Sequence, residues 1–309
     1  KRYYISDERY NVQNSIYAIY QDTKGRIWIC TQGGLYWFSP KEGTFTRING
    51  FSNMYVHNIC EDRHGNIWLA SVGGGLVCYT FDSKRVDFIS EIQRQTGHWI
   101  NKVVDVYEDK DGWLWMGTIG YGLLCYNPDD KQFSHYTIED GFPDYTAFSP
   151  IQDDFGDIWV GTRWQALYRL DRNGQVKQIF SDKNYLLGAV YHIMEDKDGN
   201  LWFSTKGNGL VKAEPDMNSP HGLRFTRYIN DPKNPNSISN NDVYFTYQDS
   251  QGRIWVGLLG GGLNLISEEN GAITFIHKYN GLKQYPAYGL YMEVRTMTED
   301  EDGRIWVGT

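Results

Sequence analysis

Aromatic and polar residues that could bind a sugar gather in a few loops of this sequence. Trp99 and Trp164 fall outside the repeated pattern of the chain, each in a predicted loop. An aromatic face packs well against the apolar side of a sugar ring, and flanking polar groups bond its hydroxyls. The candidate ligand-binding residues are Trp99, Arg163, Trp164, His98, Tyr121, Tyr145, Lys206 and Asn208. Each has a second interpretation, as a solvent-exposed or protein-interface side chain.

His192 and Asp105 are the residues that an enzyme could use as an acid/base pair. They occupy the same position in two different repeats, where small and polar residues dominate. The sequence shows no Ser-His-Asp order and no paired carboxylates of the kind that lyases and glycosidases need. We therefore interpret both as structural polar residues that line the axis of the fold, and we predict no catalytic residue.

Two further patterns could suggest a metal. Asp109–Gly112 and Asp196–Gly199 carry alternate carboxylates, but a calcium loop needs more ligands over about a dozen residues. These segments favour hairpin turns. The four cysteines, at positions 30, 60, 78 and 125, have no CxxC spacing. They are predicted to be buried free thiols; a disulfide would need two Cα atoms within about 7 Å. No metal and no cofactor is predicted.

One phrase recurs seven times and must position these loops. It reads acidic-or-Gln, Asp, two variable residues, Gly, one residue, Ile or Leu, Trp, and its copies follow one another at intervals of 40 to 53 residues. A period of this length, rich in glycine and aromatics, is typical of radially arranged β units. The repeats are centred on Trp28, Trp68, Trp115, Trp159, Trp202, Trp255 and Trp306.

Each repeat is predicted to form four short strands. In the second repeat these are Val56–Glu61, Asn66–Ser71, Leu76–Tyr79 and Val86–Ser90. The Asp of the phrase opens the first turn by bonding its own backbone, and the Gly supplies positive φ. Apolar residues at both odd and even positions of the strands indicate a sheet buried on both faces, as in a propeller blade between two neighbours. The repeated Trp would fill the space between blades.

The predicted fold is all-β: a seven-bladed β-propeller of four-stranded antiparallel blades, forming a single domain over residues 1–309. Arg2–Ser6 resembles a fourth strand, and Val294–Thr298 with Ile305–Thr309 resembles the first two strands of the last repeat. Ring closure would then make the seventh blade composite and incomplete, without a third strand. The connectors of Trp99 and Trp164 would emerge on one face.

The composition argues against two kinds of interaction, with nucleic acids and with the membrane interior. The net charge of −8 and pI of about 5.4 argue against a nucleic acid. No apolar run approaches 18 residues, so no membrane span is predicted within the sequence. Both ends interrupt a repeat, and we expect the chain to be a piece of a larger polypeptide.

The phrase Asp-x-x-Gly-x-Ile-Trp-Val-Gly-Thr, followed by Gly-Gly-Leu, resembles the two-component regulator propeller repeat. The connector Asn230–Asn241 resembles the long linker of these sensors, while Glu139–Pro143 and Tyr279–Leu282 resemble its short form. The fourth repeat departs from the pattern, with Arg163-Trp164-Gln165-Ala166 in place of its glycine-rich turn. That departure is a candidate for specialised function.

The resemblance implies a periplasmic sensor module of a Bacteroidetes hybrid two-component system, part of an inner-membrane-anchored histidine kinase. It implies sensing of oligosaccharides from complex glycans and control of polysaccharide-utilisation genes. The implied partners are an oligosaccharide ligand, a second propeller and a β-sandwich of the same chain, and a second protomer in a homodimer, with no nucleic acid bound by these residues. This fragment would not be an enzyme. The alternatives are a propeller lyase or glycosidase, and a dimerisation scaffold without ligand contact.

Overall fold

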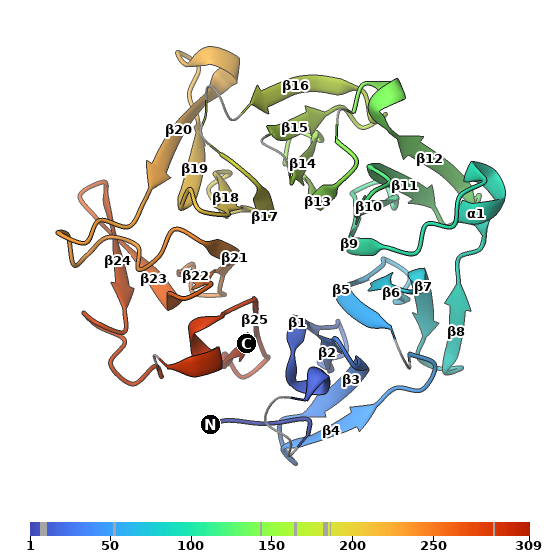
Figure 1. Cartoon of the computed structure of the whole chain (residues 1–309), viewed down its shortest axis with the longest axis horizontal. Coiled ribbons are helices and arrows are strands. Elements are labelled where there is room, and N and C mark those ends of the chain that lie inside the picture. The colour runs from blue at the N-terminus through green and yellow to red at the C-terminus, as the bar shows by residue number, and fades with distance from the viewer. Residues whose placement is uncertain are drawn as a thin grey trace. The chain divides into compact units, whose positions relative to one another are not determined.

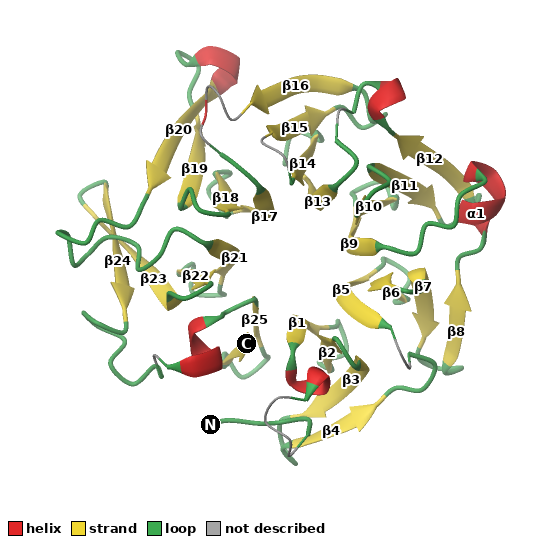
Figure 2. Cartoon of the chain, viewed as in Figure 1, coloured by secondary structure: helices red, strands yellow, loops and turns green. Residues whose placement is uncertain are grey.

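The computed structural model describes residues 1–6, 11–51, 54–142, 144–163, 166–181, 185, 187–286 and 288–309. Within these residues the strands form six four-stranded antiparallel sheets and one two-stranded sheet, each with its strands in chain order (Figures 1 and 2). The fold is an all-β propeller with four-stranded blades.

The first three blades contain β1 (Ile16–Gln21), β2 (Ile27–Thr31), β3 (Gly34–Ser39) and β4 (Thr44–Arg47); β5 (Tyr55–Glu61), β6 (Ile67–Val72), β7 (Gly75–Thr80) and β8 (Arg85–Phe88); and β9 (Val103–Glu108), β10 (Leu114–Thr118), β11 (Leu123–Asn127) and β12 (Gln132–Tyr136). The next three contain β13 (Ala147–Gln152), β14 (Ile158–Thr162), β15 (Ala166–Leu170) and β16 (Val176–Ser181); β17 (Val190–Glu195), β18 (Leu201–Thr205), β19 (Leu210–Pro215) and β20 (Leu223–Tyr228); and β21 (Val243–Gln248), β22 (Ile254–Leu258), β23 (Gly262–Glu269) and β24 (Ala272–His277). The two-stranded sheet contains β25 (Thr296–Glu299) and β26 (Ile305–Gly308).

Helical segments are short and lie in connections. They are α1 (Glu91–Thr96) and the 3-10 turns η1 (Val12–Asn14), η2 (Ile138–Asp140), η3 (Pro220–Gly222) and η4 (Gly289–Met292). The strands predicted for the second repeat are confirmed within two residues at each end. None of the helices in the described ranges is long and apolar enough to cross a membrane.

The predicted number of seven blades is wrong, because the described residues form six complete blades. The seventh repeat contributes only β25 and β26, and residues 1–6 form no strand beside them. The reason lies in Asn14, whose Oδ1 accepts the backbone N–H groups of Ile5 (2.8 Å) and Ser6 (3.1 Å). Its Nδ2 donates to the Ser6 carbonyl. The Ile5 and Ser6 amides and the Ser6 carbonyl are thus bonded to this side chain rather than to a strand of the last repeat.

The chain divides into two compact units, and each is described by itself. Unit 1 contains residues 1–152 and 300–308, and unit 2 contains residues 153–299 and Thr309. In unit 1 the sheets β1–β4, β5–β8 and β9–β12 follow one another side by side (Figure 1).

The repeated tryptophans form the core between neighbouring blades, as predicted. In unit 1, Trp28 packs into the second blade against Val56, Ile59 and Tyr79, its ring meeting that of Tyr79 edge-on at 5.7 Å. Trp68 packs in the same way into the third blade. In unit 2, Trp202 lies in a cluster with residues of the β21–β24 blade. Burying one such ring stabilises the fold by roughly 4–6 kcal/mol as an upper bound.

The Asp of each phrase locks the turn to the Trp. Asp109 shows the arrangement: its Oδ1 accepts the backbone N–H groups of Asp111 and Trp113, both at 2.9 Å, and its Oδ2 accepts Nε1–H of Trp115 at 2.7 Å. The same indole-to-carboxylate bond, at 2.7–2.8 Å, occurs in all seven repeats. The Asp-x-x-Gly segments are therefore hairpin turns, as predicted, and each carboxylate joins its turn to the Trp of the next strand.

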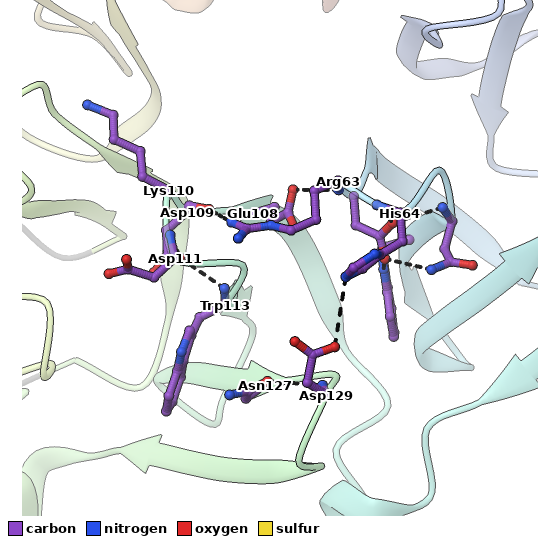
Figure 3. A network of polar contacts seen from close by, with 12 residues as sticks. Arg63, His64, Glu108, Asp109, Lys110, Asp111, Trp113, Asn127 and Asp129 are labelled. Carbon is purple, nitrogen blue, oxygen red and sulfur yellow. Dashed lines mark hydrogen bonds and ion pairs between the residues drawn. The ribbon is translucent and has the colours of Figure 1, made fainter.

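The acidic-or-Gln residue before that Asp has a different partner, in the preceding repeat. Glu61 accepts the N–H (2.6 Å) and hydroxyl (2.8 Å) of Thr23, and Glu108 accepts N–H and Nε–H of Arg63 (Figure 3). We call this contact the clasp. The six acceptors found in clasps are Glu61, Glu108, Gln152, Glu195, Gln248 and Glu299. The clasp therefore joins consecutive turns through a side-chain acceptor and a backbone donor.

The four cysteines are free thiols; Cys30, Cys78 and Cys125 are buried and Cys60 is partly buried. Burial raises the pKa of the Cys78 thiol to about 12 and raises the pKa of the other three as well. These thiols behave as small apolar core groups.

Candidate functional site

A cavity of about 460 Å³ in unit 1 brings together three of the predicted ligand-binding residues, His98, Tyr121 and Tyr145. It lies among the loop after α1, the β10–β11 turn and the connection from β12 to β13. Its lining residues are Thr96, His98, Gly120, Tyr121, His135, Thr137, Ile138, Glu139, Asp140 and Tyr145. The volume falls within the range of small-molecule sites.

Backbone hydrogen bonds hold the β10–β11 turn in place, and in one of them the Ile119 N–H donates to the Lys102 carbonyl. The Tyr145 carbonyl accepts the N–H groups of both Gly120 and Gly122, each at 2.8 Å. Gly122 has φ +73°, and a Cβ there would clash with the Tyr136 carbonyl oxygen, so no other residue fits. His135, from β12, holds Tyr121 from the other side, since its Nε2 lies 2.6 Å from the Tyr121 carbonyl oxygen. Tyr121 is thus presented on a fixed backbone.

The connection from β12 is equally well fixed. Thr137 caps η2: one carboxylate oxygen of Asp140 accepts the Thr137 N–H (3.0 Å) and hydroxyl (2.9 Å), and the Thr137 hydroxyl accepts the Glu139 N–H. This reciprocal capping box satisfies the donors at the start of the turn. It holds Ile138 and Glu139 at the cavity wall with both side chains exposed.

Four side chains at the cavity have unused hydrogen-bonding capacity. Within the described part of the chain, the side chains of His98, Tyr121, Glu139 and Tyr145 make no hydrogen bond. Tyr145 is 58 % exposed, and the His98 ring lies 6.5 Å from that of Tyr121. Hydroxyl, imidazole and carboxylate groups beside aromatic faces suit a ligand rich in hydroxyls.

The other predicted residues lie outside this cavity. Trp99 follows His98 and is 61 % exposed, but it does not line the cavity. Lys206 and Asn208 lie in the β18–β19 turn of unit 2, where the Lys206 N–H donates to the Ala189 carbonyl. Arg163, also in unit 2, is exposed after β14. Trp164 lies outside the described residues.

His192 and Asp105 are both held by packing and hydrogen bonds. His192 Nδ1 accepts the Thr246 N–H at 3.4 Å, its ring lies 4.1 Å from that of Phe245, and burial lowers its pKa to about 3. Asp105 accepts from Asn58 Nδ2 (2.6 Å) and the Ser149 N–H (2.9 Å), and burial raises its pKa to about 6. Each arrangement fits the interpretation as a structural polar residue.

Several residues near the binding loops were missed from the sequence. His135 and Glu139 line the cavity although one lies in an outer strand and the other in a connector. Bulges in the first strands also set one residue per blade apart from the ladder, and their rings stack in pairs: Tyr17 with His57 at 4.3 Å, and Tyr191 with Tyr244 at 5.7 Å. In these four repeats an aromatic side chain stands directly before the position that His192 and Asp105 occupy in theirs, and this spacing was the available signal.

Comparison with known families matches six segments of the chain, residues 12–33, 50–73, 99–120, 184–207, 237–260 and 289–309, to the family described as "Two component regulator propeller". These six segments match the two-component regulator propeller repeat. The repeat around Trp159, which carries the Arg163–Ala166 departure, is not among the matched segments.

One curated protein is similar to part of this chain, and solved structures share its fold. Residues of this chain are 27 % identical over 118 positions to "Histidine kinase P4" of Formosa agariphila, covering 37 % of this chain and 8 % of that protein. The extracellular domain of a hybrid two-component system from B. thetaiotaomicron superposes with a TM-score of 0.67 at 20 % identity, covering 99 % of this chain and 46 % of that one. The chain thus spans about half of that ectodomain.

Virginiamycin B lyase from Staphylococcus aureus superposes with a TM-score of 0.69 at 15 % identity, covering 96 % of this chain and 92 % of the lyase. At this identity the likeness concerns the fold alone, because one propeller scaffold supports many unrelated functions.

Proposed function

We propose that this chain is a ligand-sensing propeller of a hybrid two-component sensor, located in the periplasm as part of an inner-membrane-anchored protein. Its ligand is an oligosaccharide released from a complex glycan, bound in the cavity of unit 1. Binding signals to a histidine kinase that controls polysaccharide-utilisation genes.

The observation that carries this proposal is the cavity itself. Two tyrosines, a histidine and a carboxylate with unused hydrogen-bonding capacity face a space of about 460 Å³. The Tyr145 carbonyl and the Thr137–Asp140 capping box hold Tyr121, Tyr145 and Glu139 on fixed backbone. Such preorganisation lowers the entropy lost on binding. The regulator propeller repeats support the sensory role.

The proposal places residues 1–309 in one propeller domain of a longer protein. A second propeller and a β-sandwich would follow in the same chain, and the sensor would act as a homodimer. The partial coverage of the related ectodomain and kinase is consistent with this arrangement.

The chain is proposed to be non-enzymatic. A lyase or glycosidase needs reacting groups that meet at the substrate. Here the ring nitrogen Nδ1 of His192 is bonded to a backbone amide, and both oxygens of the Asp105 carboxylate accept hydrogen bonds. We expect no turnover of any oligosaccharide that binds.

The test is calorimetry and thermal unfolding of the intact protein with a panel of glucose, galactose, mannose, xylose and uronate oligosaccharides. A ligand that binds only the folded state at 100 times its Kd stabilises it by about 2.7 kcal/mol. Tyr145→Ala and Tyr121→Ala should each weaken binding by about 0.5–1.5 kcal/mol, up to roughly tenfold in Kd.

Tyr279→Ala is the matched control, since Tyr279 is 73 % exposed in unit 2 and does not line the cavity. If no oligosaccharide binds, or if Tyr279→Ala weakens binding as much as the cavity variants do, the proposed function is wrong. Product formation during the incubation would overturn the non-enzymatic part.

A further inference from the structure

Two carboxylates and no lysine or arginine line the cavity in unit 1. The two carboxylates are those of Glu139 and Asp140. One oxygen of Asp140 accepts both the N–H and the hydroxyl of Thr137, which are uncharged donors and do not cancel its charge. The Glu139 carboxylate makes no hydrogen bond and no ion pair within the described part of the chain. Of the two, Glu139 is therefore the carboxylate with both oxygens open to a ligand.

The remaining polar side chains of the wall are hydroxyl and imidazole groups, so no lysine or arginine offsets these carboxylates. A ligand carboxylate or sulfate in the cavity would therefore meet a like charge with no cation among the lining residues to receive it. An uncharged sugar would meet an acceptor instead, because an ionised carboxylate takes strong hydrogen bonds from hydroxyl groups.

We infer that Glu139 makes this cavity selective for uncharged oligosaccharides over those that carry uronate or sulfate groups. The inference rests on the proposed function and adds the chemical class of the ligand. It also assigns Glu139 as a residue that determines specificity, in a connector that otherwise belongs to the repeat pattern.

The expected size follows from exposure. Glu139 is exposed at the cavity rim, and two unit charges 4 Å apart in water interact by about 1 kcal/mol. That energy corresponds to about fivefold in Kd. The discrimination due to Glu139 should therefore be three- to fivefold at low salt, and it should disappear in 1 M salt, where the screening length is about 3 Å.

The experiment uses the intact protein at pH 8. For each neutral oligosaccharide that binds, the paired probe is the same oligosaccharide with a terminal C6 hydroxymethyl group oxidised to a carboxylate. We expect the oxidised probe to bind more weakly. In Glu139→Gln, the ratio of the Kd of the oxidised probe to that of the neutral probe should fall three- to fivefold. Glu139→Lys should bind the oxidised probe more tightly than the neutral one. The whole molecule has a net charge of −8 and repels anions generally, so Glu269→Gln, another exposed glutamate, controls for bulk charge.

The outcomes separate the two proposals. If the oxidised probe binds as well as the neutral one, or if Glu139→Gln and Glu269→Gln change the preference equally, the inference about Glu139 is overturned while oligosaccharide sensing stands. If neither probe class binds at all, the proposed function fails and the inference falls with it. A preference that persists unchanged in 1 M salt would also overturn the inference, since only a charge effect is screened.

Discussion

Replacing Asp109 by alanine tests the central lock of the repeat. Its carboxylate receives three donors: the N–H groups of Asp111 and Trp113 and Nε1–H of Trp115. The two backbone donors lie in a surface turn, where water can replace the carboxylate. The Trp115 indole is 1 % exposed, so its N–H would be left buried without an acceptor.

The expected loss of unfolding free energy follows from the exposed turn donors and the buried indole donor. An unsatisfied buried donor costs about 1–3 kcal/mol, and a lost hydrogen bond to a charged group costs about 1.5–3 kcal/mol. We expect Asp109→Ala to lower the free energy of unfolding by about 3–5 kcal/mol. In a Trp115→Phe background there is no indole bond to lose and no indole N–H to orphan, so the same substitution should cost only about 1 kcal/mol, the contribution of the surface turn.

Urea unfolding of the four proteins of this double-mutant cycle, followed by far-UV circular dichroism, measures the coupling. Asp300→Ala is the matched comparison, because Trp306 is only partly buried and its N–H can reach water. That variant should lose less stability. An Asp109→Ala cost that is equal in both backgrounds would refute the assignment of the indole bond as the dominant contribution.

Three further outcomes are expected. Glu61→Ala should lower the free energy of unfolding by about 1 kcal/mol, because it removes the clasp to Thr23. Glu61→Gln should be nearly neutral, because other repeats use Gln in the same place. Urea unfolding midpoints check both variants, and an equal loss in the two would contradict the clasp. Burial raises the pKa of Asp105 to about 6, so the folded state binds the proton more tightly than the unfolded state and the contribution of Asp105 to stability falls by about 3 kcal/mol as the pH rises from about 4 to about 6. The difference in unfolding free energy between the wild type and Asp105→Asn, measured across that range, should show this slope; a flat difference would contradict it. Because burial raises the pKa of all four thiols, Ellman's reagent at pH 8 should label none of them in the folded protein and all four after denaturation, and rapid native labelling of Cys78 would contradict its burial.

The strands and the inter-blade tryptophans could be predicted because their signals are local. An Asp, a Gly and a Trp within seven residues determine the hairpin and its lock, whatever the rest of the chain does. The number of blades could not be predicted in this way. It depended on whether residues 1–6 would pair as a strand, and the Asn14 side chain accepts the amides of Ile5 and Ser6 instead.

The cavity was predicted only in part for a similar reason. His98, Tyr121 and Tyr145 were recognisable as loop residues of suitable chemistry. His135 and Glu139 reach the same space through the β12 strand and the η2 turn, and no spacing rule links them to the other three. The clasp was missed because its acceptor and donor lie about one repeat apart, so the acidic-or-Gln position looked like part of its own hairpin.

The clasp also bears on how such chains can grow. The second to sixth repeats each bring an acceptor for the turn before and a backbone donor for the turn after. A gene segment encoding one repeat could therefore be duplicated or deleted in tandem, and the new neighbours would still fit together without any compensating substitution. Blade number would then be free to drift by whole repeats during evolution, while the loops that carry specificity diverge one by one.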